Sequence, residues 1–115
     1  MGSLEIIMPV FNESGRLTVP PEKEYREVHG KDEIAIAIYR TPGGYLYAIN
    51  CRLGMLIRSS YPHPDTPAAA SLRDARRDAC MELSRWIARN RDAKKHYEPF
   101  SILEYRQLEL PFSLD

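Results

Sequence analysis

This chain of 115 residues is poor in the residues from which most catalytic, metal and disulfide sites are built. Its two cysteines, Cys51 and Cys80, lie far apart and belong to no C-x-x-C pair, so neither a disulfide framework nor a zinc site is expected. The three histidines are dispersed, and no metalloprotease, serine-hydrolase or phosphate-loop motif occurs. We therefore expect no enzymatic activity, no cofactor and no metal ion.

Net charge and long apolar runs are lacking as well. Sixteen basic and sixteen acidic residues cancel, which removes the uniformly basic surface that non-specific nucleic-acid binding uses. No apolar run is long enough to span a bilayer, and no charged region precedes an apolar stretch at the N-terminus, so we expect neither a membrane anchor nor a signal peptide. Together with the unpaired cysteines, this predicts a cytoplasmic protein.

The residues that are present are sufficient for one folded domain. The chain is 43% apolar and 28% charged, and nine prolines against six glycines indicate stiff connections. A chain of this length fits one domain comfortably. We expect a single α+β domain at residues 1–96, followed by a distinct C-terminal segment at residues 97–115.

Alternating apolar residues predict the centre of this domain. Residues 33–40 alternate isoleucine with alanine or tyrosine, and residues 45–53 alternate again. Gly54 permits a tight reversal into residues 55–60. The pattern predicts a three-stranded antiparallel sheet.

The segments before this sheet are less regular. Residues 4–10 and 16–19 flank turn-forming residues and predict an N-terminal β-hairpin. Residues 22–32 are highly charged and follow two prolines, so they form either one short helical turn or an extended connection that ends at Gly30.

A long amphipathic helix is predicted after the sheet. Thr66 can cap free backbone N–H groups, and Pro67 fits the first helical position. From there to about Arg91 nothing breaks the helix. Apolar residues recur at steps of three and four and form one stripe for packing on the sheet: Ala68, Leu72, Ala75, Ala79, Leu83, Trp86 and Ile87.

The expected fold class is therefore α+β, with an N-terminal hairpin, a three-stranded sheet and one long helix in a β-β-β-α core. This order resembles, in architecture only, HicB-type antitoxins, double-stranded-RNA-binding folds and the DNA-binding domains of integrases. The small residues Ala35, Ala37 and Ala48 line one side of the sheet, which either the N-terminal hairpin or a second subunit of a homodimer would cover.

Charge is sorted along the chain although its total is zero. Basic residues outnumber acidic ones within residues 67–96. The polar side of the helix carries arginines that are candidates for contact with nucleic acid or another anionic partner: Arg73, Arg76, Arg77, Arg85 and Arg89. The alternative is a solvated helix face.

A second candidate for nucleic-acid contact lies in the hairpin. Residues 12–20 read NESGRLTVP, which resembles the G-R-hydrophobic-T-hydrophobic-P signature of AbrB/MazE-type swapped-hairpin DNA-binding proteins. The resemblance implies a dimer that presents Arg16, and less directly Arg26, to DNA. Where the family has an arginine after the proline, this chain has Glu24. An ordinary hairpin is the alternative.

The most specific motif lies near the C-terminus. Residues 107–112 read QLELPF, which resembles the Q-L-x-L-x-F peptide by which bacterial replication and repair proteins bind the DNA polymerase sliding clamp. The resemblance implies partner contacts by Gln107, Leu108, Leu110 and Phe112. The same residues also alternate with period two and would fit an edge strand, which Pro111 would confine to an edge.

These observations predict a non-enzymatic accessory protein of bacterial or mobile-element DNA metabolism that docks on the sliding clamp. Two other classes stay open. One is a phage-type anti-defence inhibitor, such as an anti-CRISPR protein, that acts by protein–protein contact on a defence effector. The other is a dimeric AbrB- or HicB-like DNA-binding regulator or antitoxin.

Overall fold

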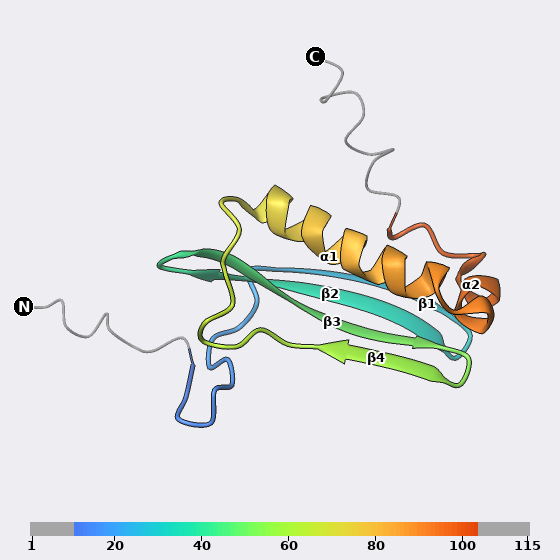
Figure 1. Cartoon of the computed structure of the whole chain (residues 1–115), viewed down its shortest axis with the longest axis horizontal. Helices are drawn as coiled ribbons and strands as arrows, with labels where there is room; N and C mark the ends of the chain where they lie inside the picture. Colours follow the sequence, from blue (N-terminus) through green and yellow to red (C-terminus); the bar gives the residue numbers. More distant parts are fainter. Residues whose placement is uncertain (1–10, 104–115) are drawn as a thin grey trace, which may run out of the picture.

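The structure, a computed structural model, describes residues 11–103. Its elements follow in the order β1 (Lys23–His29), β2 (Asp32–Thr41), β3 (Gly44–Leu53), β4 (Leu56–Ser60), α1 (Leu72–Ala88) and α2 (Arg91–Tyr97). The strands form one antiparallel sheet in the order β1-β2-β3-β4, and α1 covers one of its faces (Figure 1). The expected three-stranded sheet with one long helix is therefore wrong, since residues 11–103 form four strands and two helices.

The additional strand lies in the charged segment at residues 22–32. Its extended backbone pairs with β2 from Lys23 opposite Ile38 to His29 opposite Asp32. β1 lies at the edge of the sheet, where only one side of the strand faces the core. The helical alternative for this segment is wrong, and the extended one is a strand.

The other strands lie where the alternation predicts them. Ile34, Ile36 and Ile38 of β2 are fully buried beneath α1. The reversal after β3 is a two-residue turn between the paired residues Leu53 and Leu56, in which Gly54 adopts a left-handed φ of +66°. The turn expected in the N-terminal hairpin is present, because Asn12 N–H donates to the Arg16 carbonyl at 2.8 Å. Residues 16–19 form no strand, however, and Leu17 pairs only through an isolated bridge to Phe11. Residues 4–10 lie outside the described residues.

The helix begins later than predicted. Ala69 exchanges two backbone hydrogen bonds with Tyr45, at 2.9 and 2.8 Å, which holds the chain extended beside β3. Thr66 consequently caps a turn, accepting from the N–H of His63 at 2.7 Å. The N-cap of α1 is Ser71, whose Oγ accepts from the N–H of Asp74 at 3.0 Å.

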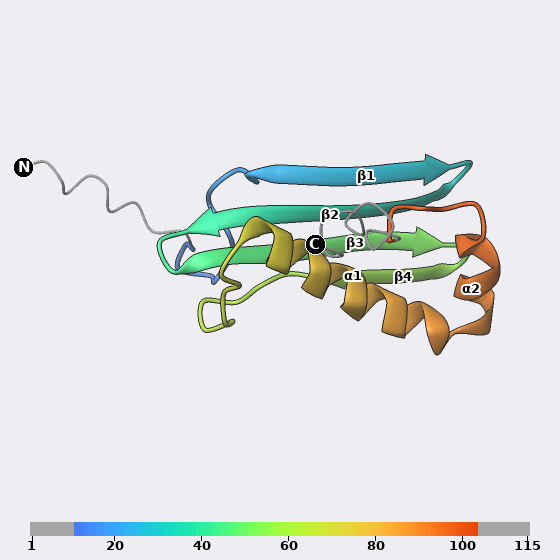
Figure 2. The same cartoon turned by 90° about the horizontal axis from the view of Figure 1, so that it is seen from above.

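The helix also ends earlier than predicted. α1 stops at Ala88, and α2 starts after Asn90, whose side-chain amide donates to the Trp86 carbonyl at 2.6 Å. α1 crosses the strands obliquely, and α2 follows at the end of the sheet where β2 begins and β3 ends (Figure 2). Within residues 11–103, neither helix has the length and apolarity needed to cross a bilayer.

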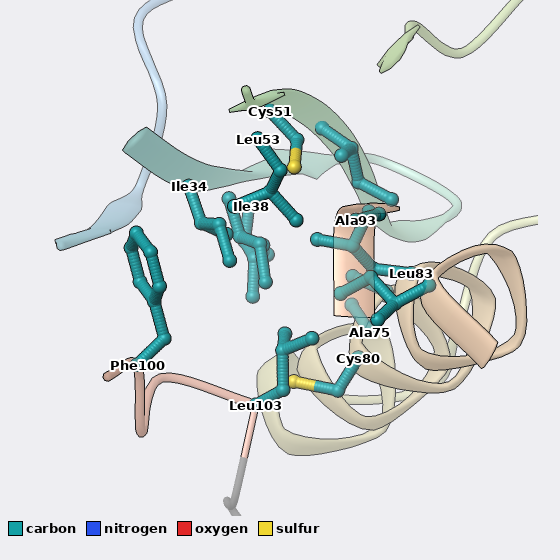
Figure 3. Close-up of a cluster of buried hydrophobic side chains, with 14 residues drawn as sticks. Ile34, Ile38, Cys51, Leu53, Ala75, Cys80, Leu83, Ala93, Phe100 and Leu103 are labelled. Atoms are coloured by element: carbon teal, nitrogen blue, oxygen red, sulfur yellow. The ribbon is translucent and has the colours of Figure 1, made fainter. Parts of the chain in front are cut away.

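The core lies between α1 and the sheet (Figure 3). The expected apolar stripe is confirmed for its central residues, since Ala75, Ala79, Leu83 and Ile87 are buried there. The core continues past residue 96, the expected end of the domain, with residues that follow α2: Phe100 and Leu103. The packed domain therefore includes the beginning of the segment at residues 97–115.

Candidate functional site

The face of the sheet turned away from α1 forms the first candidate binding surface, which we call the open face. Its floor consists of the small residues Ala35, Ala37 and Ala48, above which lies a shallow cavity of about 410 Å³. The larger side chains around this cavity are Glu24, Arg26, Lys31, Glu33, Tyr39, Asn50, Arg52, Ile57 and Tyr61. Charges of both signs therefore surround an apolar floor.

Several polar groups of the open face bind one another. Arg26 Nε lies 3.0 Å from a carboxylate oxygen of Glu33. The side-chain amide of Asn50 donates to the hydroxyl of Tyr61 at 3.1 Å, and its oxygen accepts from Ser59 Oγ at 3.0 Å. Because these groups already have partners, they are not free to bind a small anion.

The loop that carries Arg16 lies at one end of the open face. A Cβ built on Gly15 would lie 3.7 Å from the Pro64 ring, and Arg16 lines a second cavity of about 650 Å³ beside Tyr39 and Tyr61. Burial raises the pKa of Tyr39, and the neighbouring Tyr61 and Glu24 raise it further. The Tyr39 phenol therefore stays neutral at pH 7 and can donate a hydrogen bond.

A groove between β3, β4 and α1 is the second candidate surface, and its volume is about 520 Å³. Tyr47, which lines the groove, donates to a carboxylate oxygen of Glu82 at 2.5 Å, and Arg58 donates to the other oxygen at 2.8 Å. We call this arrangement the Tyr47–Glu82–Arg58 triad. It joins the two strands to the helix.

The triad shifts the proton affinities of its members. Burial alone would raise the pKa of Glu82, but the hydrogen bonds from Tyr47 and Arg58 outweigh it and lower the pKa below its ordinary value. Burial, reinforced by the Glu82 carboxylate, raises the pKa of Tyr47. At neutral pH the triad is therefore a carboxylate held by a phenol and a guanidinium, which makes it a structural tie.

Two histidine–carboxylate pairs lie at the end of the sheet near α2. His96 Nδ1 is 2.8 Å from one oxygen of Asp32, and the N–H of Gly54 donates to the other at 2.9 Å. His29 Nε2 is 2.6 Å from Glu27, which also accepts from the N–H of Ser101. The pairs tie α2 and the chain after it to the sheet.

Sequence spacing could not have revealed the Asp32–His96 pair, whereas Glu27 and His29 are two residues apart on one strand. Spacing places a histidine near an aspartate in one rigid loop, at residues 61–65, whereas the fold joins Asp32 and His96 across 64 positions. In the part of the chain that the structure describes, no three histidine, cysteine or acidic side chains gather as metal ligands would.

The five helix arginines do not share one surface. Arg76 lies over the Tyr25 ring of β1, with its guanidinium carbon 4.3 Å from the ring centroid. Arg77 forms ion pairs with Asp74 at 3.3 Å and Asp78 at 3.5 Å. Three others are exposed, namely Arg73, Arg85 and Arg89, of which Arg85 lines the groove. The exposed arginines are thus interleaved with acidic residues.

The predicted clamp-binding residues Gln107, Leu108, Leu110 and Phe112 lie outside the described residues. The last buried residue that the structure describes is Leu103, which is 9% exposed. No known protein family matches the chain, and neither a curated protein nor a solved structure matches it significantly.

Proposed function

We propose that this protein is a non-enzymatic accessory factor of bacterial or mobile-element DNA metabolism that docks on the DNA polymerase sliding clamp through residues 107–112. The observation that carries the proposal is the sequence QLELPF. Leu110 and Phe112 fill an apolar pocket of the clamp, and Gln107 forms hydrogen bonds at a polar subsite. Pro111 stiffens the peptide and so reduces the conformational entropy lost on binding.

The anchoring of the chain just before this motif supports the proposal. Phe100 is 2% exposed, and its ring meets that of His29 edge-on, with centroids 4.5 Å apart. Ser101 donates its N–H to Glu27, and Leu103 is buried in the core. A domain that holds its chain firmly up to residue 103 presents the following peptide from a defined point on its surface.

The test is the affinity of the purified chain for a purified bacterial sliding clamp, measured by calorimetry. We expect Gln107→Ala to weaken binding at least about tenfold, which corresponds to about 1.4 kcal/mol. The double change of Leu110 and Phe112 to alanine abolishes measurable binding, since it removes both apolar anchors. Glu109→Gln is the matched control and leaves the affinity unchanged, because position 109 is variable in the motif.

A peptide of residues 104–115 should bind the clamp and displace the full chain. A full chain that does not bind the clamp, or that binds it equally well with both anchors removed, contradicts the proposal. Salt-sensitive binding to duplex DNA that Arg16→Ala or Arg77→Ala weakens would instead support a DNA-binding regulator. Specific capture of a defence nuclease would support an inhibitor.

A further inference from the structure

The two edges of the sheet differ in chemistry. β1 carries charged side chains at most positions, including Lys23, Glu24, Arg26 and Glu27, and such charges protect an edge strand from pairing with another chain. β4 has one charged residue, Arg58, which turns toward α1 and is held by Glu82. The edge of β4 therefore lacks this protection.

Exposed apolar side chains flank the unprotected edge. Ile57 is 63% exposed and Tyr61 is 55% exposed, and both lie on the open-face side of the sheet. Met55, in the turn before β4, is 96% exposed. Large apolar side chains alternating along an edge strand are typical of a strand that pairs with another one.

The backbone of β4 is oriented for such pairing. Because Leu53 and Leu56 flank a two-residue turn, they form a hydrogen-bonded pair, and the N–H and C=O groups of Leu56, Arg58 and Ser60 point toward β3. Those of Ile57 and Ser59 point away from the sheet, and the same alternation continued one step past the end of β4 turns those of Tyr61 outward as well. Within residues 11–103 no other strand pairs with this side of β4.

We propose that β4 pairs antiparallel with β4 of a second copy of this chain, around a twofold axis at Ser59. In this register the outward backbone groups of Ser59 bond to those of Ser59 in the second copy, and those of Ile57 bond to Tyr61. The two sheets then form one continuous sheet with both α1 helices on the same face. The contact is isologous and closes as a dimer.

The side chains favour this register over the one that has its twofold axis at Arg58. On the open face Ile57 lies opposite Tyr61 of the second copy, so two exposed apolar side chains cover each other. On the α1 face Arg58 lies opposite Ser60. An axis at Arg58 would instead place two like charges directly opposite each other, which is destabilising. Pro62 has no N–H and ends the ladder after Tyr61.

The first test is the mass of the purified chain by light scattering over a series of concentrations, with the dimer as the expected species. Ser59→Pro removes an N–H that makes no bond to β3, so it should yield a folded monomer whose circular dichroism is unchanged. Ser59→Ala is the matched control. It loses the same hydroxyl contact with Asn50 but keeps the backbone N–H, and it stays a dimer.

The second test addresses the register. Ile57→Lys and Tyr61→Glu should each dissociate the dimer, because each places a charge against an apolar side chain of the second copy. A lysine is chosen at position 57 because Arg52, its partner on β3, would neutralise a glutamate there. The chain that carries both changes should form the dimer again, because each glutamate then faces a lysine of the second copy. This recovery does not depend on the sliding clamp, so its failure is distinguishable from failure of the proposed function.

Cross-linking provides a third measurement. Ser59→Cys should form a symmetric disulfide on mild oxidation, because paired residues on adjacent strands lie within the separation that a disulfide spans. Glu24→Cys, on the opposite edge, is the control and should form none. The proposal is overturned if the wild-type chain is monomeric throughout, or if its dimer survives Ser59→Pro unchanged.

Discussion

Gly54 lies directly against the ring of His96: a Cβ built on Gly54 would come within 2.7 Å of Nε2. The same glycine has a left-handed φ of +66°, so two constraints act at one position. Its backbone N–H holds Asp32, which in turn binds His96. The β3–β4 turn is therefore fitted to α2, although the two are far apart along the chain.

Replacing this glycine should reveal both constraints. We expect Gly54→Ala to lower the free energy of unfolding by about 1–3 kcal/mol for its backbone conformation and by a similar amount for the clash with His96. Gly30→Ala is the matched control, because Gly30 has φ +65° but no atom within 4 Å of its added Cβ. Equal losses for the two variants in urea unfolding would show that His96 moves away freely.

Acid should weaken the fold through its held carboxylates. The hydrogen bond from Gly54 is the main cause that lowers the pKa of Asp32 below its ordinary value of 3.8, and the pKa of Glu82 is lowered below 4.5. The unfolded chain therefore binds protons first as the pH falls. The stabilisation is complete above the ordinary values and is lost as the pH falls through the depressed ones.

This dependence is measurable as the free energy of unfolding between about pH 6 and pH 2. Asp32→Asn and Glu82→Gln should each be less stable than the wild type at neutral pH and lose less stability on acidification. The exposed Asp92 provides the control, since Asp92→Asn should leave the profile unchanged. An identical profile for Asp32→Asn would contradict the interpretation.

The Tyr47–Glu82–Arg58 triad should behave as a coupled unit. We expect Tyr47→Phe and Glu82→Gln to cost about 1 kcal/mol each, because each leaves a half-buried polar group without its partner. The double variant should lose less than the sum, with a coupling energy of about 0.5–3 kcal/mol. Strict additivity in urea unfolding would indicate that the Tyr47 hydroxyl and Glu82 contribute independently.

Arg76 should contribute to stability through Tyr25. The cation–π contact predicts a loss of about 0.5–1 kcal/mol for Arg76→Ala in urea unfolding. Arg89→Ala, at the exposed C-cap of the same helix, should change the free energy by less than about 0.5 kcal/mol. If the two variants cost the same, the contact with Tyr25 contributes nothing.

The two thiols should be unreactive in the folded protein. Cys51 and Cys80 are 2% and 1% exposed, and burial raises the pKa of Cys51 to about 12. Thiolate is the reactive form, so Ellman's reagent should label neither residue until guanidinium chloride unfolds the chain. Labelling of the native protein would reveal local opening of the core.

The central strands were predictable because the isoleucines of β2 alternate with small residues and Gly54 marks the following turn. β1 was not, since an edge strand buries only one side and its charges resemble those of a solvated loop. Tyr25 and Glu27 face the core side of β1, and this sparse alternation is the only signal the sequence carries for a strand there.

The start of α1 was mispredicted because a tertiary contact overrode a local preference. Thr66 and Pro67 have the composition of a helix start, but pairing of Ala69 with Tyr45 keeps the chain extended. Ser71 followed three residues later by Asp74 also resembles an N-terminal capping pattern, and this second signal marks the true start. Local sequence alone does not show which of these two start signals the helix uses.

The candidate sites likewise differ in whether local sequence or tertiary contacts determine them. The triad and the Asp32–His96 pair depend on which strands and helices become neighbours, so no spacing in the sequence reports them. The QLELPF motif at residues 107–112 is different, because a linear peptide motif can be identified from its sequence alone, without knowledge of the fold.

The burial of Leu103 limits the distance between the domain and a protein bound to the QLELPF motif. Four residue steps separate it from Gln107, and fully extended backbone covers about 14 Å over that distance. A protein that binds Gln107 must therefore come within this distance of Leu103, which is close enough for it to contact the surface of the domain as well. Because the connection between the domain and the motif is so short, the surface of the domain influences the orientation of the bound partner as well as the affinity of the complex.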